Sequence, residues 1–505
     1  MIIEGKEVKE KLLQGIDLVA NTVKPTLGPQ AKTVILQGNP PVVINDGVTI
    51  TKYISHEDPY VQMGVQLVQN LASKAQQGSG DGTTTACILA QALCHRIMDS
   101  VGNISVHDFN SIMETVRDNM CTILTEYSNE VDDGSIRDIA TIASNNDSEM
   151  GQLITDALFK VGRDGIVTVE ESKSHLTDLV VREGMEVPEG YISHLMAGED
   201  GKASFNNPLI FLSNMPFRNF NELLPMLEHA ATCKRPLLIL CKGMEGSSLN
   251  NLLMNIVNKT VDCAVILAPN FGDAQLDELG DIQSLVGGTV FNVGSKADPT
   301  NFDEFDFGTC EQVTVTKEKT TFIGAEGDTT VRISTLKKTL QDMQGHDAAR
   351  IKSRISRLNG GIATIRVGAA SSIEMREKKE RLDDALNATK AALEEGIVVG
   401  GGLSLAKASL QVSKNNPDMD LVWFRDALHE PIRALISNSN LDVGSKMQDI
   451  LPFEGVGFNA LTGKLSHLES DGVFDPVKVT KNSFLAAMSI ANLFYSTDVA
   501  VLVEE

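Results

Sequence analysis

Hydrophobic residues recur at helical spacing in the first third of the chain and again in its last quarter. In residues 61–77 the apolar positions share one helix face, and this stretch ends at Gly78-Ser79-Gly80. The apolar positions of that face are Val61, Val65, Val68, Leu71, Ala72 and Ala75. A second helix is predicted from Thr83, and a long charged helix is predicted over residues 371–395, before Gly396. The pattern therefore predicts a mainly helical framework.

The middle of the chain, residues 185–360, has a different pattern. Residues 237–240 and 264–268 are apolar runs, and residues 246–258 between them have helical spacing. Such alternation is typical of an α/β domain, which is here inserted into the helical framework. Gly184 and Gly360-Gly361 flank this insert and are either hinges or ordinary turn glycines, and the pattern alone allows both. Residues 499–505 read as a short β-strand closed by charged residues.

Length and charge narrow the class of protein. A chain of 505 residues is too long for one hydrophobic core, so we expect about two to four domains. The net charge of −23 argues against a nucleic-acid binder, whose affinity rests on Lys and Arg paired with phosphates. It also argues against adhesion to an anionic membrane. The simplest explanation of the acidity is solubility.

The seven cysteines are scattered and form no CxxC pair. Free thiols in a reducing compartment are therefore expected, rather than a disulfide framework or a zinc site. The first residues have neither the layout of a signal peptide nor the character of a transit peptide. No apolar run is long enough to span a bilayer. Together these features predict a cytoplasmic location.

The sharpest motif is Gly80-Asp81-Gly82-Thr83-Thr84-Thr85, between two predicted helices. Glycines let the backbone approach a ligand closely, and the three threonine N–H groups would open a helix, whose positive end suits phosphate. Asp81 can bind a divalent cation, and the threonine hydroxyls can add oxygen contacts. The GxxxxGK[ST] pattern of a P-loop is absent. Read alone, the motif is also a common turn and helix cap, so both readings stay open.

Three shorter motifs have a structural and a functional reading. Thr26-Leu27-Gly28-Pro29 either ends a helix or presents main-chain groups to a nucleotide. Asn45-Asp46-Gly47 follows the apolar runs 33–36 and 42–44, which look like a hairpin, and is strong turn chemistry. Gly400-Gly401-Gly402 either lets the backbone approach a base or ribose or is a linker.

Aspartates in separate segments could act together. Asp383-Asp384 lies in the charged helix, where such residues usually form a solvated face. Phosphate hydrolysis, however, needs a metal, a positioned water and a carboxylate that orients the attack. Asp46, Asp81 and Asp384 could supply these roles if the fold brings them together.

Two apolar stripes in the middle region have helical spacing. The first comprises Leu249, Leu252, Leu253 and Ile256, and the second comprises Leu223, Leu224 and Leu227. Stripes of this kind are usually core and only in a minority of cases a binding surface.

Read together, the motifs resemble one family. They are TLGP at 26–29, NDG at 45–47, MGVQLVQNLASKA at 63–75, GDGTTTA at 80–86, APNFGD at 268–273, GGTV at 287–290, EMREKKERLDDALNATKAALEEGIVVGGG at 374–402 and FDPVKVT at 474–480. Their order and spacing resemble those of the group I (GroEL-type) chaperonins, from about residue 5 to about residue 500.

The resemblance implies a multidomain α+β fold with three domains. A mainly helical equatorial ATP-binding domain would comprise 1–126 and 395–505, and a small intermediate domain 127–182 and 363–394. An α/β apical domain, 183–362, would be inserted in the middle and hinged at Gly184 and Gly361. The resemblance also implies an ATP-dependent chaperonin that captures non-native proteins, with ATP and Mg²⁺ as cofactors and K⁺ as a further candidate cation. Its expected partners are other copies of the chain in a double sevenfold ring, a GroES-type lid and non-native clients, without nucleic acid or membrane.

The resemblance also assigns residues. Nucleotide-binding positions are Thr26, Leu27, Gly28, Pro29, Asp81, Gly82, Thr83, Thr84, Thr85, Ile142, Gly400, Gly401, Asn459, Ala460, Val473 and Asp475. Asp81 would bind Mg²⁺, Asp384 would activate the hydrolytic water, and Asp46 would be a second carboxylate near the γ-phosphate. Positions for clients and lid are Tyr191, Ser193, Leu195, Met196, Leu224, Leu227, Leu249, Leu253 and Met254. On this reading part of the Leu249 stripe is exposed.

Several positions depart from the family pattern. Asn45 replaces a Lys and Ala143 replaces a Ser near the nucleotide, while Glu189 and Ser372 replace an Arg and a Glu that pair between subunits. These changes favour a divergent bacterial paralogue over a main housekeeping chaperonin. They also keep open a non-cycling chaperonin that holds clients with slow or no ATPase. An unrelated ATP-dependent metabolic enzyme would need a substrate-pocket motif, and the sequence contains none.

Overall fold

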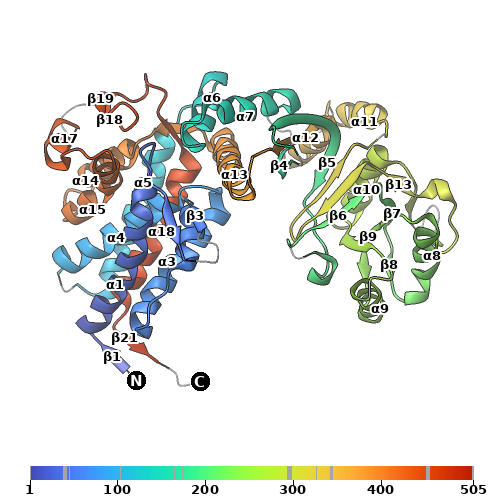
Figure 1. Ribbon diagram of the computed structural model, residues 1–505, viewed down its shortest axis with the longest axis horizontal. Coiled ribbons are helices and arrows are strands. Elements are labelled where there is room, and N and C mark those ends of the chain that lie inside the picture. Colours follow the sequence, from blue (N-terminus) through green and yellow to red (C-terminus); the bar gives the residue numbers. More distant parts are fainter. Residues whose placement is uncertain are drawn as a thin grey trace. The chain divides into compact units, whose positions relative to one another are not determined.

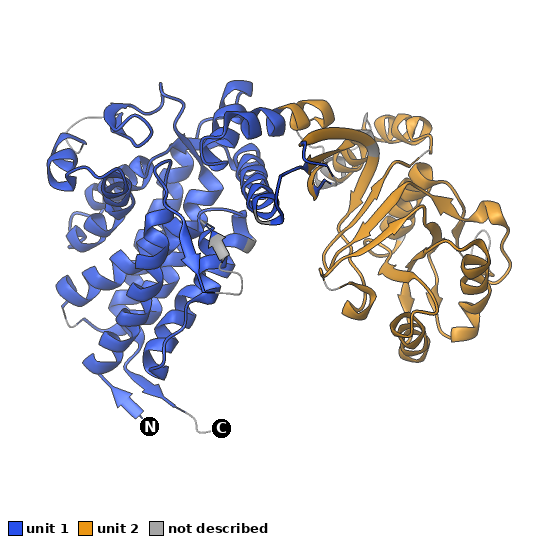
Figure 2. Cartoon of the chain, in the orientation of Figure 1, with its two compact units in different colours: residues 1–155, 171–176, 367–505 blue, residues 156–170, 177–366 orange. Residues whose placement is uncertain are grey.

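The computed structural model describes residues 2–37, 42–44, 46–102, 104–162, 166–172, 174–198, 200–292, 298–325, 327–341, 345–450 and 455–502. The chain forms two compact units, of which unit 1 comprises residues 1–155, 171–176 and 367–505 (Figure 2). Unit 2 comprises residues 156–170 and 177–366. The middle of the chain thus forms a unit of its own, as the alternating pattern predicts. The finer division into three domains stays a prediction.

Unit 1 is built mainly from helices (Figure 1). They are α1 (Lys6–Val23), η1 (Lys24–Thr26), α2 (Gly47–Tyr53), α3 (Pro59–Ser79), α4 (Thr83–Ser100), α5 (Val106–Glu126), α6 (Asp133–Ala143), α13 (Ser372–Glu395), α14 (Leu403–Asn415), α15 (Val422–Leu428), α16 (Glu430–Asn438), α17 (Val443–Ile450) and α18 (Val477–Ser496). A further helix, α7 (Ser148–Val161), leads along the chain from unit 1 into unit 2.

The core of unit 1 lies between α1, α3, α4, α5 and α18, which pack side by side (Figure 1). Every apolar position predicted for the buried face of α3 is at most 2% exposed. The Asp58 side chain accepts a hydrogen bond from the Tyr60 N–H and so caps the start of α3. The predicted charged helix is confirmed as α13, which begins after its cap Ser371. Apolar spacing, charge density and the glycines that follow thus predicted both helices, and the structure adds their caps.

Short antiparallel strand pairs complete unit 1. The pairs are β1 (Ile2–Glu4) with β21 (Val499–Val501), β2 (Val34–Leu36) with β3 (Val42–Ile44), β17 (Ile397–Val399) with β20 (Phe474–Pro476), and β18 (Val456–Asn459) with β19 (Lys464–His467). The predicted hairpin is confirmed, because Val34 lies opposite Ile44. The predicted terminal strand is confirmed as β21, where Val501 pairs with Ile2; residues 503–505 lie outside the described residues.

Unit 2 contains two larger sheets. The first has the order β11-β9-β7-β12, all parallel, with β13 antiparallel to β7. The second has the order β4-β16-β5-β15-β14-β6. The strands are β4 (Ile166–Glu171), β5 (Asp178–Val187), β6 (Ala203–Asn206), β7 (Leu209–Ser213), β9 (Leu237–Cys241), β11 (Cys263–Leu267), β12 (Val290–Phe291), β13 (Gly308–Thr309), β14 (Gln312–Val315), β15 (Thr320–Ile323) and β16 (Gly361–Val367), with the short pair β8 (Pro216–Phe217) and β10 (Gly243–Met244).

Helices connect the strands of unit 2 and cover its core (Figure 1). They are η2 (His194–Met196), η3 (Phe220–Glu222), α8 (Leu224–Cys233), α9 (Gly246–Val257), α10 (Asp273–Val286), η4 (Glu304–Asp306), α11 (Thr330–Gln341) and α12 (Gly345–Asn359). The predicted succession of strand, helix and strand is confirmed as β9, α9 and β11. Among the described residues, no helix has both the length and the apolarity needed to cross a membrane.

The two flanking glycines have different surroundings. Gly184 lies inside β5 opposite Ile323, so its reading as a turn glycine is wrong. A Cβ at Gly184 would stand 2.3 Å from the Phe322 carbonyl oxygen, so only glycine allows the strands to approach this closely. Gly361 begins β16, opposite Glu183. Their role as hinges stays a prediction.

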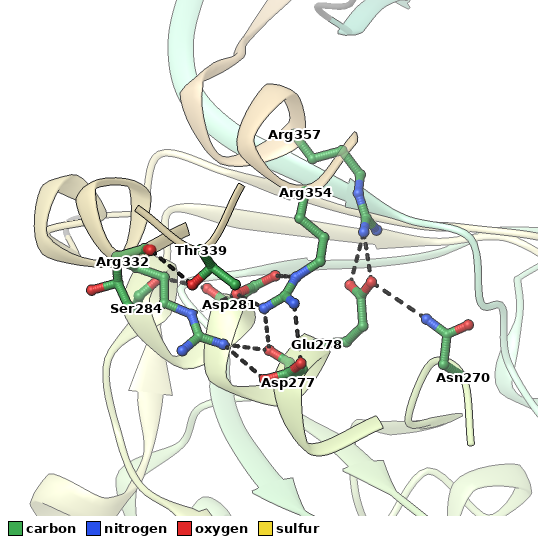
Figure 3. Close-up of polar contacts among 10 residues, drawn as sticks. Asn270, Asp277, Glu278, Asp281, Ser284, Arg332, Thr339, Arg354 and Arg357 are labelled. Atoms are coloured by element: carbon green, nitrogen blue, oxygen red, sulfur yellow. Dashed lines mark hydrogen bonds and ion pairs between the residues drawn. The ribbon is translucent and has the colours of Figure 1, made fainter. Parts of the chain in front are cut away.

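Unit 2 also contains a buried network of ion pairs (Figure 3). Arg354 of α12 donates from Nε to Asp281 Oδ2 at 2.6 Å and from Nη2 to Asp281 Oδ1 at 2.9 Å. Arg332 of α11 donates to the same carboxylate at 2.7 Å. Arg357 Nη2 donates to both carboxylate oxygens of Glu278, at 2.7 and 2.9 Å. The carboxylates all come from α10, so the network ties α11 and α12 to that helix.

Candidate functional site

One cavity of about 440 Å³ in unit 1 collects most of the predicted site residues. Those that line it are Thr26, Leu27, Gly28, Pro29, Asp46, Asp81, Gly82, Thr83, Thr84, Thr85, Ile142, Asp384, Gly401, Asn459, Ala460, Val473 and Asp475. Gly400 lies just behind the wall, where a Cβ would stand 2.9 Å from Asp475 Oδ1. The fold thus brings together segments that are hundreds of residues apart, which motif spacing alone could not establish.

The glycine motif forms the turn between α3 and α4. Gly80 and Gly82 have φ values of 69° and 85°, in the left-handed region that favours glycine. A Cβ at Gly80 would stand 2.4 Å from the Asn387 Cβ, and one at Gly82 would stand 2.3 Å from Ser483 Oγ. Gly82 is the N-cap of α4 and has no side chain to cap the first turn. Residues 83–85 of that turn line the cavity, so its uncapped N–H groups and the positive end of the helix suit an anion there.

The turn at residues 26–29 forms the neighbouring wall. Asn438 of α16 holds it, because its Nδ2 donates to the carbonyl oxygens of Lys24 and Leu27, both at 3.0 Å. The Thr26 hydroxyl lies 3.5 Å from the Thr84 hydroxyl of α4. Two of the predicted motifs are therefore in direct contact.

Three aspartates from separate elements face the cavity. Asp46 is the N-cap of α2, and its carboxylate accepts from the N–H groups of Val48 and Thr49 at 3.1 and 2.7 Å. Burial raises the pKa of Asp81, and the charge of Asp46 raises it further. Burial also raises the pKa of Asp384 well above its usual range, with the charges of Asp81 and Asp46 adding to the effect. The carboxylates thus repel one another, and a bound cation would relieve that repulsion.

The acidic cavity fits a magnesium ion only together with a phosphate ligand. Among the described residues, no group of three or more His, Cys, Asp or Glu side chains is arranged to hold a metal. Mg²⁺, however, commonly uses one or two carboxylates and takes its remaining ligands from water and substrate phosphates. Asp81, beside the free first turn of α4, has the chemistry and position for this kind of binding.

Another part of the cavity wall is formed by α6 and by strands from the last quarter of the chain. The Gly400 N–H donates to the Val473 carbonyl oxygen at 2.9 Å, next to the β17–β20 pair. Asn459 ends β18, and its Nδ2 donates to Asp471 at 2.7 Å. Burial raises the pKa of Asp475 to about 6, and the charge of Asp81 adds to the shift. This wall combines backbone, apolar and polar groups, as a nucleoside site requires.

Sequence reasoning missed several cavity residues. Gln76, Asp138, Asn145, Asn146, Glu380, Arg381, Asp471 and Ser483 also line the cavity. Glu380 precedes Asp384 by one helical turn, a spacing that places both on the same face of α13 and could have revealed it. Gln76 likewise lies in the last turn of α3, before the glycine motif. The others come from segments without a recognisable local signal.

The predicted client-binding residues all lie in unit 2 but differ in exposure. Leu195, Leu224 and Met254 are 45%, 37% and 63% exposed. Four others are partly exposed, namely Tyr191, Ser193, Leu249 and Leu253. Met196 and Leu227 are buried in the core. Part of the Leu249 stripe is therefore open to solvent, whereas Leu252 within it is fully buried.

The positions that depart from the family pattern fall in three places. Ala143 lines the cavity. Glu189 lies in unit 2, where burial raises the pKa of its carboxyl. Ser372 begins α13. Asn45 lies outside the described residues.

Comparisons with known proteins agree with this architecture. The model of the TCP-1/cpn60 chaperonin family matches residues 19–504. A crystal structure of the chaperonin gp146 from bacteriophage EL 2 (Pseudomonas aeruginosa), in presence of ATP-BeFx, is 20% identical, with a TM-score of 0.73 and coverage of 100% of both chains. A second crystal form of gp146 is 19% identical, with a TM-score of 0.66 and coverage of 100% of this chain and 99% of that one. At this identity the likeness shows the fold, and it confirms the predicted multidomain α+β architecture. The family match extends over nearly the whole sequence, and the chain therefore belongs to the TCP-1/cpn60 chaperonin family.

Proposed function

We propose that this protein is an ATP-hydrolysing chaperonin that captures non-native proteins and promotes their folding within a ring. The observation that carries the proposal is the convergence of Asp46, Asp81 and Asp384 with an uncapped helix N-terminus on one cavity. A nucleoside triphosphate suits both features, because its phosphates match the helix end and its bound cation matches the carboxylates.

In this proposal the nucleotide lies along the cavity. Its phosphates contact the first turn of α4, residues 83–85, and the turn at 26–29. Mg²⁺, held by Asp81 and phosphate oxygens, would neutralise charge on the phosphates. The base and ribose contact the part of the wall that includes Ile142, Asn459 and Asp475. The gp146 structures in presence of ATP-BeFx support a nucleotide as the ligand to test first.

Hydrolysis in this site follows from the position of Asp384. Its carboxylate accepts a proton from a water molecule, whose oxygen attacks the γ-phosphorus while the bond to the bridging oxygen of ADP breaks. The raised pKa of Asp384 suits a general base that works near neutral pH, because a general base is most effective when its pKa lies near the operating pH. Asp46 would act as a second carboxylate near the γ-phosphate.

The apolar residues of unit 2 support client capture. Leu195, Leu224 and Met254 are exposed, and Leu249 and Leu253 of α9 are partly exposed. Flexible Leu and Met side chains suit contacts with many different unfolded chains. Met196 and Leu227 would support this surface from the core.

Two exposed strand pairs in unit 1 support assembly into a ring. Among the residues that the structure describes, the pairs β1–β21 and β2–β3 have only two strands each, so both leave free backbone edges. Ile2, Ile35 and Val501 on these strands are 62%, 71% and 50% exposed. Such edges can pair with those of a neighbouring copy. A double sevenfold ring and a GroES-type lid are the assembly and partner to test.

A second function remains in view, namely a chaperonin that holds clients without cycling. Ala143 favours it, because this cavity residue lacks the hydroxyl that the family pattern has at the position. Client capture through unit 2 would not depend on hydrolysis.

The test is ATP turnover by the purified protein, with assembly size measured by light scattering and capture of a denatured client measured on the same sample. We expect large assemblies that hydrolyse ATP, and a loss of at least about a hundredfold in Asp384→Ala. Asp383→Ala, which removes the neighbouring carboxylate of α13, is the matched control and should retain turnover. Wild type that assembles and captures client without turnover would favour the holding function. Wild type that does neither would contradict both.

A further inference from the structure

Gln76 contacts both Asp384 and the first turn of α4 in the proposed catalytic site. It lies in the last turn of α3 and lines the cavity. Its Nε2 donates to Asp384 Oδ1 at 3.4 Å, and its Oε1 accepts from the Thr83 hydroxyl at 3.4 Å. One amide therefore contacts both the carboxylate of α13 and the first residue of α4.

The orientation of this amide follows from its partners. An ionised Asp384 can only accept hydrogen bonds, so the Gln76 NH₂ group must face it, and the carbonyl oxygen is then left for the Thr83 hydroxyl. Both contacts are long, which is common for catalytic hydrogen bonds before a ligand tightens the site. The bond to Asp384 also favours its ionised form, because it counters part of the effect of burial on the pKa.

A second contact shows that α13 packs directly against the glycine turn near Asp384. Asn387 lies one helical turn after Asp384, and its Cβ occupies the space where a Cβ of Gly80 would stand. The position of Asp384 thus depends on the end of α3. Gln76 supplies a polar contact there, and Gly80, which lacks a Cβ, leaves space for Asn387 of α13.

We propose that Gln76 is a positioning residue for hydrolysis. It fixes the position of the Asp384 carboxylate relative to the phosphate-binding first turn of α4. The inference rests on the proposed function, since it requires Asp384 to act on a bound nucleotide. It adds a residue that contacts neither the water nor the phosphates in that scheme. Its effect should therefore fall on kcat rather than on nucleotide affinity.

Two substitutions separate the contacts of Gln76. Gln76→Met has a similar size and removes both hydrogen bonds. Gln76→Glu keeps an acceptor for the Thr83 hydroxyl but replaces the donor that faces Asp384. The matched control is Gln66→Glu, an exposed position on the same helix. The measurements are steady-state ATP turnover, ATP affinity by calorimetry and assembly size by light scattering, all with the full chain.

We expect both variants to lower kcat about tenfold to a hundredfold, the cost of a misplaced catalytic group. ATP affinity of Gln76→Met should stay within about threefold of wild type, and Gln66→Glu should behave as wild type. In a double-mutant cycle, Gln76→Met should cause little further loss in the Asp384→Ala protein, because the carboxylate that it positions is gone.

Three results would overturn the inference. Turnover of Gln76→Glu at the wild-type rate would show that only the Thr83 contact matters. Additive losses in the cycle would show that Gln76 acts independently of Asp384. Both results leave the proposed function standing. Wild type that binds ATP without hydrolysing it would remove the catalytic proposal and this inference together.

Discussion

Each unit of this chain contains a cluster of carboxylates, and the two clusters differ in whether arginines neutralise their charge. In unit 2, Asp281 and Glu278 are buried and bonded to arginines of α11 and α12 (Figure 3). In unit 1, Asp81 and Asp384 face a cavity, where burial raises the pKa of both; the charge of Asp46 adds to each shift, and that of Asp81 adds to the shift of Asp384. Among the described residues, no Lys or Arg forms an ion pair with either of them. Arg381 lines the same cavity but is paired with Glu377.

The difference indicates where the opposite charge comes from. A carboxylate that is neutralised within the chain serves the fold, because its partner is always present. A carboxylate that lies near other carboxylates and has no cationic partner destabilises the empty site, and a cation that arrives with a ligand relieves this cost. The two clusters should therefore respond to mutation with opposite signs.

The largest effect is expected in the unit 2 network. Asp281→Asn should lower the free energy of unfolding of unit 2 by about 3–5 kcal/mol, because it leaves Arg354 buried without a full counter-charge. Hydrogen exchange measured by mass spectrometry on the full chain should show faster exchange in peptides of α10, α11 and α12. Trp423, the only tryptophan, lies in unit 1, and its fluorescence should report an unchanged unfolding transition there.

Asp277→Asn is the matched control for this prediction. Asp277 lies on the same helix and pairs with the same arginines, but its side chain is 47% exposed. Its substitution should cost no more than about 1 kcal/mol. Equal effects of the two substitutions would mean that burial does not decide the strength of the network.

A smaller effect of opposite sign is expected at the cavity. Without nucleotide and Mg²⁺, Asp384→Asn should raise the free energy of unfolding of unit 1 by about 1–2 kcal/mol, because it removes repulsion from Asp81 and Asp46. Trp423 fluorescence during urea unfolding measures this change. Asp418→Asn, at an exposed loop position of the same unit, should stay within about 0.5 kcal/mol of wild type. A destabilised Asp384→Asn protein would show that its carboxylate is neutralised within the chain.

Much of this comparison could be predicted from the sequence, but unequally in the two units. Helical periodicity predicted α3, the charged stretch before Gly396 predicted α13, and the glycine motif predicted the turn before α4. The resemblance to chaperonins singled out the aspartates, and the fold then placed them around one cavity. Gln76 and Asp138 could not be found in this way, because a lone polar residue on a helix has no distinctive local pattern. Their importance comes from tertiary contacts.

The network of unit 2 was missed for a related reason. Asp277, Glu278 and Asp281 look like the solvated face of a charged helix, and Arg354 and Arg357 look like another. Only the packing of α12 against α10 brings them together and buries Glu278, Asp281 and Arg354. The sequence also left the exposure of the apolar stripes undetermined, since Leu252 and Leu253 both fit the helical spacing, yet Leu252 is buried and Leu253 is partly exposed.

The smallest expected effect concerns a carboxylate of unit 1 that lies outside the cavity, Asp17. It tests whether a charged histidine neutralises this group. His95 Nε2 lies 2.7 Å from Asp17 Oδ1, and this hydrogen bond raises the pKa of His95, with the charge of Asp17 adding to the shift. Because the folded-state pKa exceeds the unfolded one, the pair stabilises the protein fully below about pH 6.5. That stabilisation is lost as the pH rises through the folded-state pKa. Both side chains are partly exposed, so the total should be no more than about 1 kcal/mol.

The measurement is urea unfolding followed by Trp423 fluorescence at about pH 6 and pH 8, for wild type and His95→Gln. The difference between the two proteins removes the contribution of other titrating groups. We expect wild type to be the more stable at pH 6 and the two to converge at pH 8. A constant difference at both pH values would show that the contact does not depend on a charged histidine. Convergence would show that within one unit a histidine neutralises Asp17, while the cavity carboxylates are left for a ligand.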